Sequence, residues 1–278
     1  MNNRLGNLRE ALKERKLDGL LVSTPENRRY ISGFTGSAGY LLVTQGDAIL
    51  ATDFRYVEQA GQQSPAFRVV RVGTSYDWFP KLLAEASVSK VGFESENMSV
   101  ALFRRMTQTL KESTAANSSK PRLLATAGIV EELRSRKDAE EMRLLQRAID
   151  ISDQALDTVA PTIMAGQTER EVAWRLEVAM RELGAEGPSF DTIVGAGPNG
   201  ALPHHRAGER PIQEGEPIVI DMGANYQGYC SDLTRTIVLG APDETFRRVY
   251  DTVLGAQLTA IATVRAGMTG AEADGLAR

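Results

Sequence analysis

Two aspartates in a predicted β-hairpin constrain this chain more than any other feature of the sequence. Asp221 directly follows the apolar run Ile218-Val219-Ile220, and Asp232 lies near the start of the returning strand pattern. If Tyr226-Gln227 forms a two-residue loop, Asp221 lies directly across from Asp232 on one face of the sheet. Directly opposed side chains have Cβ atoms about 5 Å apart, where two carboxylates repel each other unless a cation lies between them. The hairpin therefore predicts a site for a divalent cation, since carboxylate oxygens are suitable ligands.

The simpler interpretation is a pair of solvated hairpin aspartates, because aspartate is usually exposed. The apolar run Ile218-Val219-Ile220 weakens it, because such a run is typical of a buried strand.

Composition excludes several classes of protein. The chain has 278 residues, which favours two domains, and its net charge of −4 argues against a general nucleic-acid binder. No apolar run approaches the roughly 20 residues of a membrane span, so we expect no membrane association. The N-terminus lacks the pattern of a secretory signal, and the single cysteine, Cys230, excludes an internal disulfide. We therefore expect a cytoplasmic protein, with Cys230 as a packing residue.

The first part of the chain alternates helix and strand patterns. Helical spacing begins at Leu5, and a further helix is predicted at 100–111. Strands are predicted at 19–23, 40–44, 48–51, 67–72 and 88–93. The segment 112–121 is polar and rich in turn residues, so we interpret it as the exposed end of a first domain, residues 1–125.

The second part, residues 126–278, opens with helices and then forms strands. A broad apolar face predicts a helix over 138–160, and the capping box Thr168–Glu171 begins another, ending near Gly184. Strands follow at 190–194 and through the aspartate hairpin, and an amphipathic helix runs from Phe246 to near Gly267.

The glycine-rich segment Gly195–Gly200 lacks the Lys-Ser/Thr of a P-loop and the third glycine of a dinucleotide fingerprint. We interpret it as a strand-to-loop connection that leads to His204. His204 and His205 are the only histidines, so a His-rich zinc site within this chain is excluded.

Several segments together resemble a known family. They are Asn27–Gly39, Thr52–Tyr56, Pro203-His204, Ile218–Ala224 and Gly228–Thr236. The chain resembles the pita-bread metallopeptidases that act on proline peptides, Xaa-Pro aminopeptidase and Xaa-Pro dipeptidase (prolidase). The resemblance covers the chain from about residue 4 to its end. It implies an α/β N-terminal domain like that of creatinase, followed by an incomplete α+β pita-bread domain.

The resemblance also implies a site and a reaction. The family holds two divalent metal ions, manganese or cobalt with zinc as a further option, between two Asp, one His and two Glu. Asp221 would bind one ion as a bidentate ligand and Asp232 would bridge both. His204 matches a histidine that helps bind the substrate, and Thr234 would support a ligand by strand alternation. His205 has no counterpart, and we interpret it as a loop residue.

The sequence departs from the family pattern at its end. A capping box at Thr269–Glu272 predicts a helix after which the chain stops, whereas the family's His and both Glu ligands lie beyond that helix. We expect that the chain is truncated, that it holds two of five ligands and binds the ions incompletely, and that it is severely impaired as an enzyme. The intact protein is expected to act on proline-containing peptides as a homodimer or higher homo-oligomer.

Two other functions remain open. One is a non-hydrolytic peptide- or protein-binding module with the pita-bread fold, and the other is a creatinase-like amidinohydrolase that uses no metal. The retained aspartate pair argues against both. The sequence does not separate aminopeptidase from dipeptidase activity.

Overall fold

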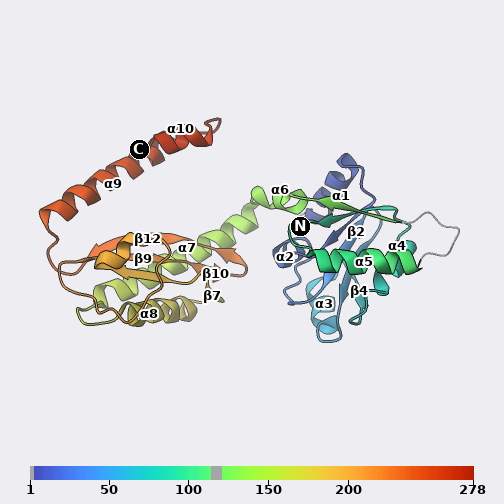
Figure 1. Cartoon of the computed structure of the whole chain (residues 1–278), viewed down its shortest axis with the longest axis horizontal. Helices are drawn as coiled ribbons and strands as arrows, with labels where there is room; N and C mark the ends of the chain where they lie inside the picture. Colours follow the sequence, from blue (N-terminus) through green and yellow to red (C-terminus); the bar gives the residue numbers. More distant parts are fainter. Residues whose placement is uncertain (1–2, 114–120) are drawn as a thin grey trace. The chain divides into compact units, whose positions relative to one another are not determined.

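The computed structural model describes residues 3–113 and 121–278. The chain divides into two compact units, Met1–Lys137 and Asp138–Arg278 (Figure 1). The expected order, an α/β unit followed by an α+β unit, is confirmed.

The first unit is built on a six-stranded sheet in the order β4-β3-β2-β1-β5-β6. Strand β2 runs antiparallel to β1 and β3, and the other neighbouring pairs are parallel. The elements are α1 (Arg4–Glu14), β1 (Gly19–Val22), α2 (Pro25–Ser32), β2 (Tyr40–Thr44), β3 (Ala48–Thr52), α3 (Val57–Gln63), β4 (Arg68–Arg71), α4 (Trp78–Glu85), β5 (Lys90–Glu94), α5 (Val100–Ser113), β6 (Arg122–Thr126) and α6 (Ile129–Ser135). All five predicted strands of this region and the helix at 100–111 are confirmed.

Both faces of this sheet are buried. Leu20 packs in a cluster with Leu8 of α1, whereas its neighbour Leu21 packs on the other face with Phe79 and Leu83 of α4. A strand buried on both faces reads as a continuous apolar run, which explains the sequence of β1.

The first unit extends past the expected boundary at residue 125. Strand β6 pairs with β5, and α6 buries Ile129 and Val130 in the cluster that contains Leu8. Residues 114–120 of the polar segment 112–121 lie outside the described residues, and the strand after it belongs to the first sheet.

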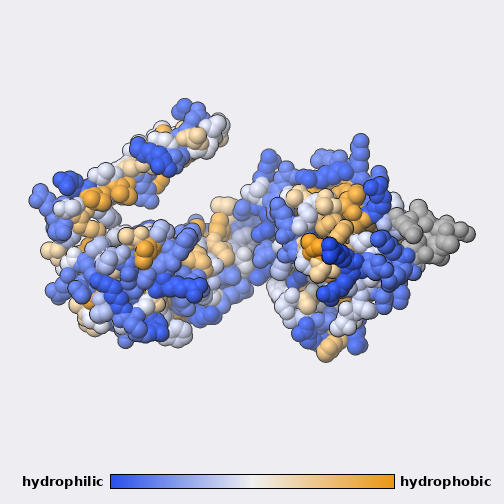
Figure 2. Space-filling view, viewed as in Figure 1, coloured by the Kyte–Doolittle hydropathy of each residue, from blue (hydrophilic) through white to orange (hydrophobic). Residues whose placement is uncertain are grey.

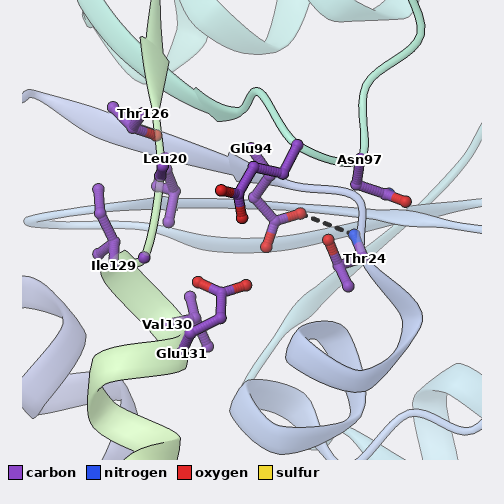
Figure 3. Close-up of a pocket in the computed structure, with 11 residues that line it drawn as sticks. Leu20, Thr24, Glu94, Asn97, Thr126, Ile129, Val130 and Glu131 are labelled. Carbon is purple, nitrogen blue, oxygen red and sulfur yellow. Dashed lines mark hydrogen bonds between the residues drawn. The ribbon is translucent and has the colours of Figure 1, made fainter. Parts of the chain in front are cut away.

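A buried carboxylate joins β5 to the turn between β1 and α2. Glu94 accepts hydrogen bonds from the amides of Ser23 (2.6 Å) and Thr24 (2.7 Å) and from Asn27 Nδ2 (2.7 Å). It borders a cavity of about 20 Å³, close to the volume that one water molecule needs (Figure 3). The hydrogen bonds compensate the burial of Glu94, so this acidic group is part of the fold of the first unit.

The second unit packs helices against small antiparallel sheets. Its elements are α7 (Ala139–Val159), η1 (Ala160–Thr162), α8 (Glu169–Glu182), β7 (Gly187–Pro188), β8 (Ile193–Ala196), η2 (Gly197–Ala201), β9 (Pro217–Met222), β10 (Ala224–Tyr226), β11 (Tyr229–Cys230), β12 (Leu233–Val238), α9 (Glu244–Thr263) and α10 (Gly270–Gly275). One sheet has the order β12-β9-β8 and the other the order β11-β10-β7. The capping boxes predicted at Thr168 and Thr269 are present.

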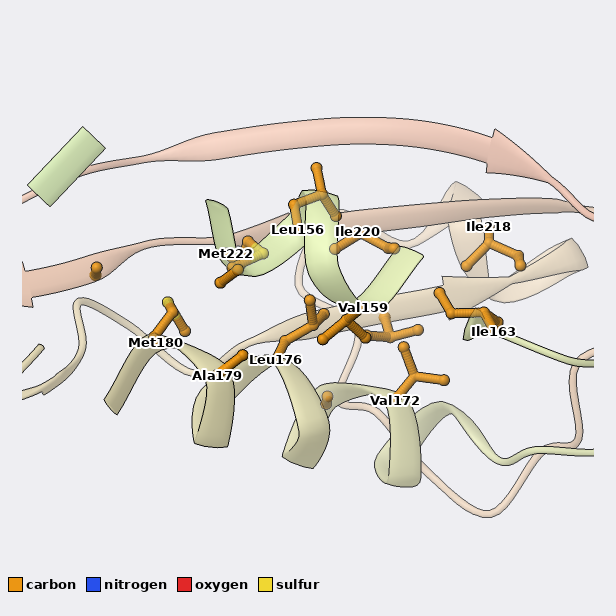
Figure 4. Close-up of a cluster of buried hydrophobic side chains, with 14 of the residues drawn as sticks. Leu156, Val159, Ile163, Val172, Leu176, Ala179, Met180, Ile218, Ile220 and Met222 are labelled. Atoms are coloured by element: carbon orange, nitrogen blue, oxygen red, sulfur yellow. The ribbon is translucent and has the colours of Figure 1, made fainter. Parts of the chain in front are cut away.

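Strand β9 presents its side chains alternately to the apolar core and to the opposite face of its sheet. Ile218, Ile220 and Met222 are buried in the cluster formed with α7 and α8 (Figure 4). Val219 and Asp221 alternate with them and are only half-buried. The alternation directs Asp221 away from the apolar core.

Helix α9 confirms the predicted amphipathic helix, but none of its residues is buried. Figure 2 shows apolar side chains at the surface along this segment. Five residues from this region are each more than half exposed: Val249, Val253, Leu258, Ile261 and Val264. Among the helices of the described ranges, none combines the length and apolar character needed to cross a membrane.

Candidate active site

The hairpin that carries the two aspartates has a different register from the predicted one. Tyr226 pairs with Tyr229, so the loop is Gln227-Gly228 and not Tyr226-Gln227. Asp221 lies across from Thr234 and not from Asp232, so the predicted direct opposition is wrong.

The cause of the difference is the turn geometry. Gln227 (φ 49°) and Gly228 (φ 80°) both lie in the left-handed region, as a two-residue hairpin loop of type I′ requires. The predicted loop would have placed the bulky Tyr226 in that region and left Gly228 in a strand. Asn225 stabilises the observed turn, because its Oδ1 accepts a hydrogen bond from the amide of Gly228 (3.1 Å).

The two aspartates nevertheless face the same pocket. The register shifts by an even number of residues, and such a shift keeps each side chain on its original face. Asp221 lies in β9 and is half-buried, and Asp232 directly precedes β12 and is exposed. Both line one pocket, which retains the shared face that the sequence predicted.

Thr234 is the direct partner of Asp221 across the strands. Its hydroxyl donates a hydrogen bond to Asp221 Oδ1 (2.9 Å). This contact matches the supporting role expected for Thr234, and it restricts the rotation of the Asp221 carboxylate. One carboxylate of the pair is thus oriented by a neighbouring side chain.

A buried serine network fixes the backbone beside Asp232. The hydroxyls of Ser152 and Ser231 are hydrogen-bonded to each other, and the amide of Ala224 donates to both, at 3.1 and 2.9 Å. Ser189 Oγ donates to the carbonyl of Ser231 (2.8 Å). A Cβ atom at Gly223 would overlap that carbonyl and the Ser189 hydroxyl, so only glycine fits at this junction between β9 and β10.

The pocket has a volume of about 470 Å³, within the usual range for small-molecule sites. Its lining combines apolar, acidic and basic side chains: Phe190, Asp191, Ile193, Pro203, His204, His205, Arg206, Asp221 and Asp232. The sequence-predicted site residues Asp221, Asp232 and His204 therefore meet in one place. Asp191 and Arg206 were not identified from the sequence, which offers no pattern that marks either of them.

The aspartates suit a hard divalent cation but do not form a complete cage. They supply carboxylate oxygens, and Thr234 orients one of them. Within residues 3–113 and 121–278, no cluster of three or more His, Cys, Asp or Glu side chains is arranged to hold a metal ion. The pocket therefore supplies part of the carboxylate ligand set that a metal ion requires.

Glu169 is a buried acidic residue whose role was not recognised from the sequence. It directly follows Thr168. The capping-box pattern predicts roles for Thr168 and Glu171 but none for Glu169. Its side chain is fully buried and hydrogen-bonded to His205 Nε2 (2.8 Å). His205, interpreted as a simple loop residue, therefore has a specific partner.

Hydrogen bonding decides the charge state of Glu169. Burial by itself would raise the pKa of its carboxyl, but hydrogen bonds from the amide of Ala196, from Asn199, from His205 and from the amide of Gly208 outweigh burial and hold the pKa below its ordinary value of 4.5. Glu169 is therefore ionised at neutral pH.

The lowered pKa predicts a pH-dependent contribution to stability. A carboxyl whose pKa is lower in the folded state stabilises the fold fully above its unfolded pKa and loses that contribution as pH falls through the folded pKa. Glu169→Gln should lower the free energy of unfolding by about 1–3 kcal/mol near neutral pH, because charged hydrogen bonds are lost. The difference from the native protein should shrink as pH falls below 4.5.

Urea denaturation followed by circular dichroism, from pH ~7 down to pH ~3, measures this difference. Glu182→Gln, at the exposed end of α8, is the control and should change the unfolding free energy by no more than about 0.5 kcal/mol. A Glu169→Gln difference that stays constant to the acid limit would contradict the assignment.

The chain matches two family patterns in sequence. Residues 4–136 match the creatinase/prolidase N-terminal domain, and residues 143–278 match metallopeptidase family M24. An uncharacterized peptidase, YqhT of Bacillus subtilis, is 37% identical over 276 residues, which cover 99% of this chain and 76% of that protein.

Solved structures agree with the sequence matches. The Xaa-Pro dipeptidase from Bacillus anthracis superimposes with a TM-score of 0.92 at 37% identity, covering 99% of this chain and 75% of that one. The X-Pro aminopeptidase from Thermotoga maritima gives a TM-score of 0.87 at 34% identity, covering 96% and 76%. The chain therefore belongs to metallopeptidase family M24, with a creatinase/prolidase N-terminal domain before its pita-bread domain.

Proposed function

We propose that this protein is a metal-dependent peptidase that hydrolyses the bond between an N-terminal residue and proline. The observation that carries the proposal is the meeting of Asp221, Asp232 and His204 in one pocket of an M24 chain. The similar proteins of known structure named above carry dipeptidase and aminopeptidase designations for Xaa-Pro substrates, which support this substrate class.

Asp221 and Asp232 would hold divalent metal ions. We propose two ions, manganese or cobalt, with Asp221 bound to one and Asp232 shared between them. When bound, such ions supply Lewis-acid polarisation of the scissile carbonyl and an activated water. The hard oxygen donors of the pair and the orienting hydrogen bond from Thr234 support this assignment.

The remaining lining suits the rest of the substrate. Phe190, Ile193 and Pro203 provide apolar surface against which a proline ring can pack. The exposed imidazole of His204 can hydrogen-bond the substrate near the scissile bond. In this proposal His204 is the catalytic residue that binds the substrate and stabilises the developing charge.

Loss of one aspartate should abolish most activity. Asp232→Asn keeps the shape of the side chain but removes a negative oxygen ligand, so kcat/KM of the intact protein for an Xaa-Pro dipeptide with added manganese should fall by at least about 10²-fold. Asp251→Asn, on the exposed surface of α9, is the matched control and should retain the native rate. Undiminished, manganese-dependent turnover by Asp232→Asn would refute the assignment.

Loss of the Thr234 hydroxyl should weaken metal binding without removing a ligand. Thr234→Val is nearly isosteric and deletes the hydrogen bond to Asp221 Oδ1, so the affinity for Mn²⁺ should fall about 10- to 100-fold. Isothermal titration calorimetry measures the affinity, with Thr236→Val on the same strand as the control. Equal affinities of the native protein and Thr234→Val would show that this hydrogen bond does not orient the ligand.

We also propose that the protein assembles as a homodimer or higher homo-oligomer, as the resemblance implies. Light scattering at several protein concentrations tests the proposal, because a closed dimer should give about twice the monomer mass across the concentration range. A monomer mass throughout would exclude this assembly.

A further inference from the structure

Glu169, in the first turn of α8, binds the loop formed by residues 196–208, which we call the His204 loop. Its Oε1 accepts hydrogen bonds from the amide of Ala196 (2.9 Å) and from Asn199 Nδ2 (2.9 Å). Its Oε2 accepts from His205 Nε2 (2.8 Å) and from the amide of Gly208 (3.2 Å). These donors are distributed along residues 196–208, from the end of β8 to the far side of His204.

The backbone reinforces the same attachment. The amide of Glu169 donates to the carbonyl of Arg210 (3.2 Å), and the amide of Arg170 donates to the carbonyl of Gly208 (3.0 Å). Beyond this point Arg210 forms a bidentate ion pair with Glu216 at 2.7 and 2.6 Å. The connection between β8 and β9 is therefore held at both ends, with His204 between them.

Glu169 is not needed to cap its own helix. The capping hydrogen bonds at the start of α8 are made between Thr168 and Glu171. A carboxylate that is fully buried costs free energy unless several donors compensate it, and every donor to Glu169 comes from the His204 loop. The buried Glu169 carboxylate therefore stabilises the conformation of the His204 loop and not the start of its own helix.

His205 links the buried carboxylate to the pocket. Its side chain is only 14% exposed, its Nε2 contacts Glu169, and its amide donates to the carbonyl of Leu202 (3.1 Å). His204, the adjacent residue, is exposed in the same pocket. Fixing the side chain and the amide of His205 fixes the backbone from which the His204 imidazole projects.

We propose that Glu169 and His205 are positioning residues that hold the 196–208 loop so that His204 is presented to the substrate, an inference that rests on the proposed peptidase function. They do not touch the substrate in this proposal. They act through His204, and a displacement of a catalytic group by about 1 Å can cost about 10²-fold in rate.

The test combines kinetics with a double-mutant cycle. In the intact protein, Glu169→Gln should lower kcat for an Xaa-Pro dipeptide by up to about 10²-fold while changing KM by less than about threefold. In a His204→Ala background the same substitution should have almost no further effect, because the group it positions is absent. An equal loss in both backgrounds would overturn the proposal.

Conservative substitution at His205 separates hydrogen bonding from packing. His205→Gln retains an N–H donor toward Glu169 and should recover most of the kcat that His205→Ala loses. Glu171→Gln, in the same helical turn and with the same change of charge, is the control and should leave kcat within about twofold. Equal losses in His205→Gln and His205→Ala would contradict the hydrogen-bonding role.

Hydrogen exchange gives a readout that is independent of activity. The amides of Ala196 and Gly208 donate to Glu169, so their exchange should accelerate at least about 10-fold in Glu169→Gln and stay unchanged in Glu171→Gln. Unchanged exchange in Glu169→Gln would overturn the proposal. If the intact protein with manganese fails to cleave Xaa-Pro peptides, the proposed function fails, and this exchange measurement alone then decides whether Glu169 holds the loop.

Discussion

The register between β9 and β12 is the constraint on which the candidate site depends. It is set by the Gln227-Gly228 turn, where two consecutive residues adopt left-handed conformations. From that turn the register places Thr234 beside Asp221 and brings Asp232 to the same face. A change of register by a single residue would turn one aspartate toward the apolar core, where Ile220 and Met222 now lie. The turn therefore controls the chemistry of a pocket that it does not touch.

A second constraint acts on the other wall of the pocket. The pairing of β9 with β12 places Asp221 and the start of β12, which Asp232 directly precedes. The segment with His204 has no regular structure beyond the short helix η2. Such a connection needs side-chain partners to adopt one conformation, because its backbone groups lack ladder hydrogen bonds. The buried carboxylate of Glu169 provides them. The pocket thus combines one face of a sheet with a loop attached to a helix.

The sequence predicted the strands and helices, and which side chains share a face, better than it predicted strand register or contacts between distant side chains. The apolar runs of β1 and β9 identify strands, and an even shift in pairing does not disturb which side chains share a face. The pairing itself was predicted from a Tyr226-Gln227 loop, whereas the left-handed Gln227-Gly228 turn shifts the register by two residues. The Glu169–His205 contact joins residues far apart in the chain, and no local pattern distinguishes this glutamate from the capping residues around it. Nor does any pattern mark Asp191 or Arg206, which only the fold brings to the pocket.

The pocket gathers acidic side chains, and like charges that lie close together repel unless neighbouring groups compensate them. Asp221 and Asp232 line it on a shared face, and Asp191 adds a further acidic group to the lining. The compensation is local: Thr234 donates to Asp221, and Arg206 places a cation in the same pocket. The backbone contributes as well, because the hydroxyls of Ser152 and Ser231 fix the junction between β9 and β10 at Gly223, where no side chain fits. Residues that carry function are often placed at some cost in stability. Here the serine hydrogen bonds and Gly223 fix the backbone next to Asp232, beside the strand that carries Asp221.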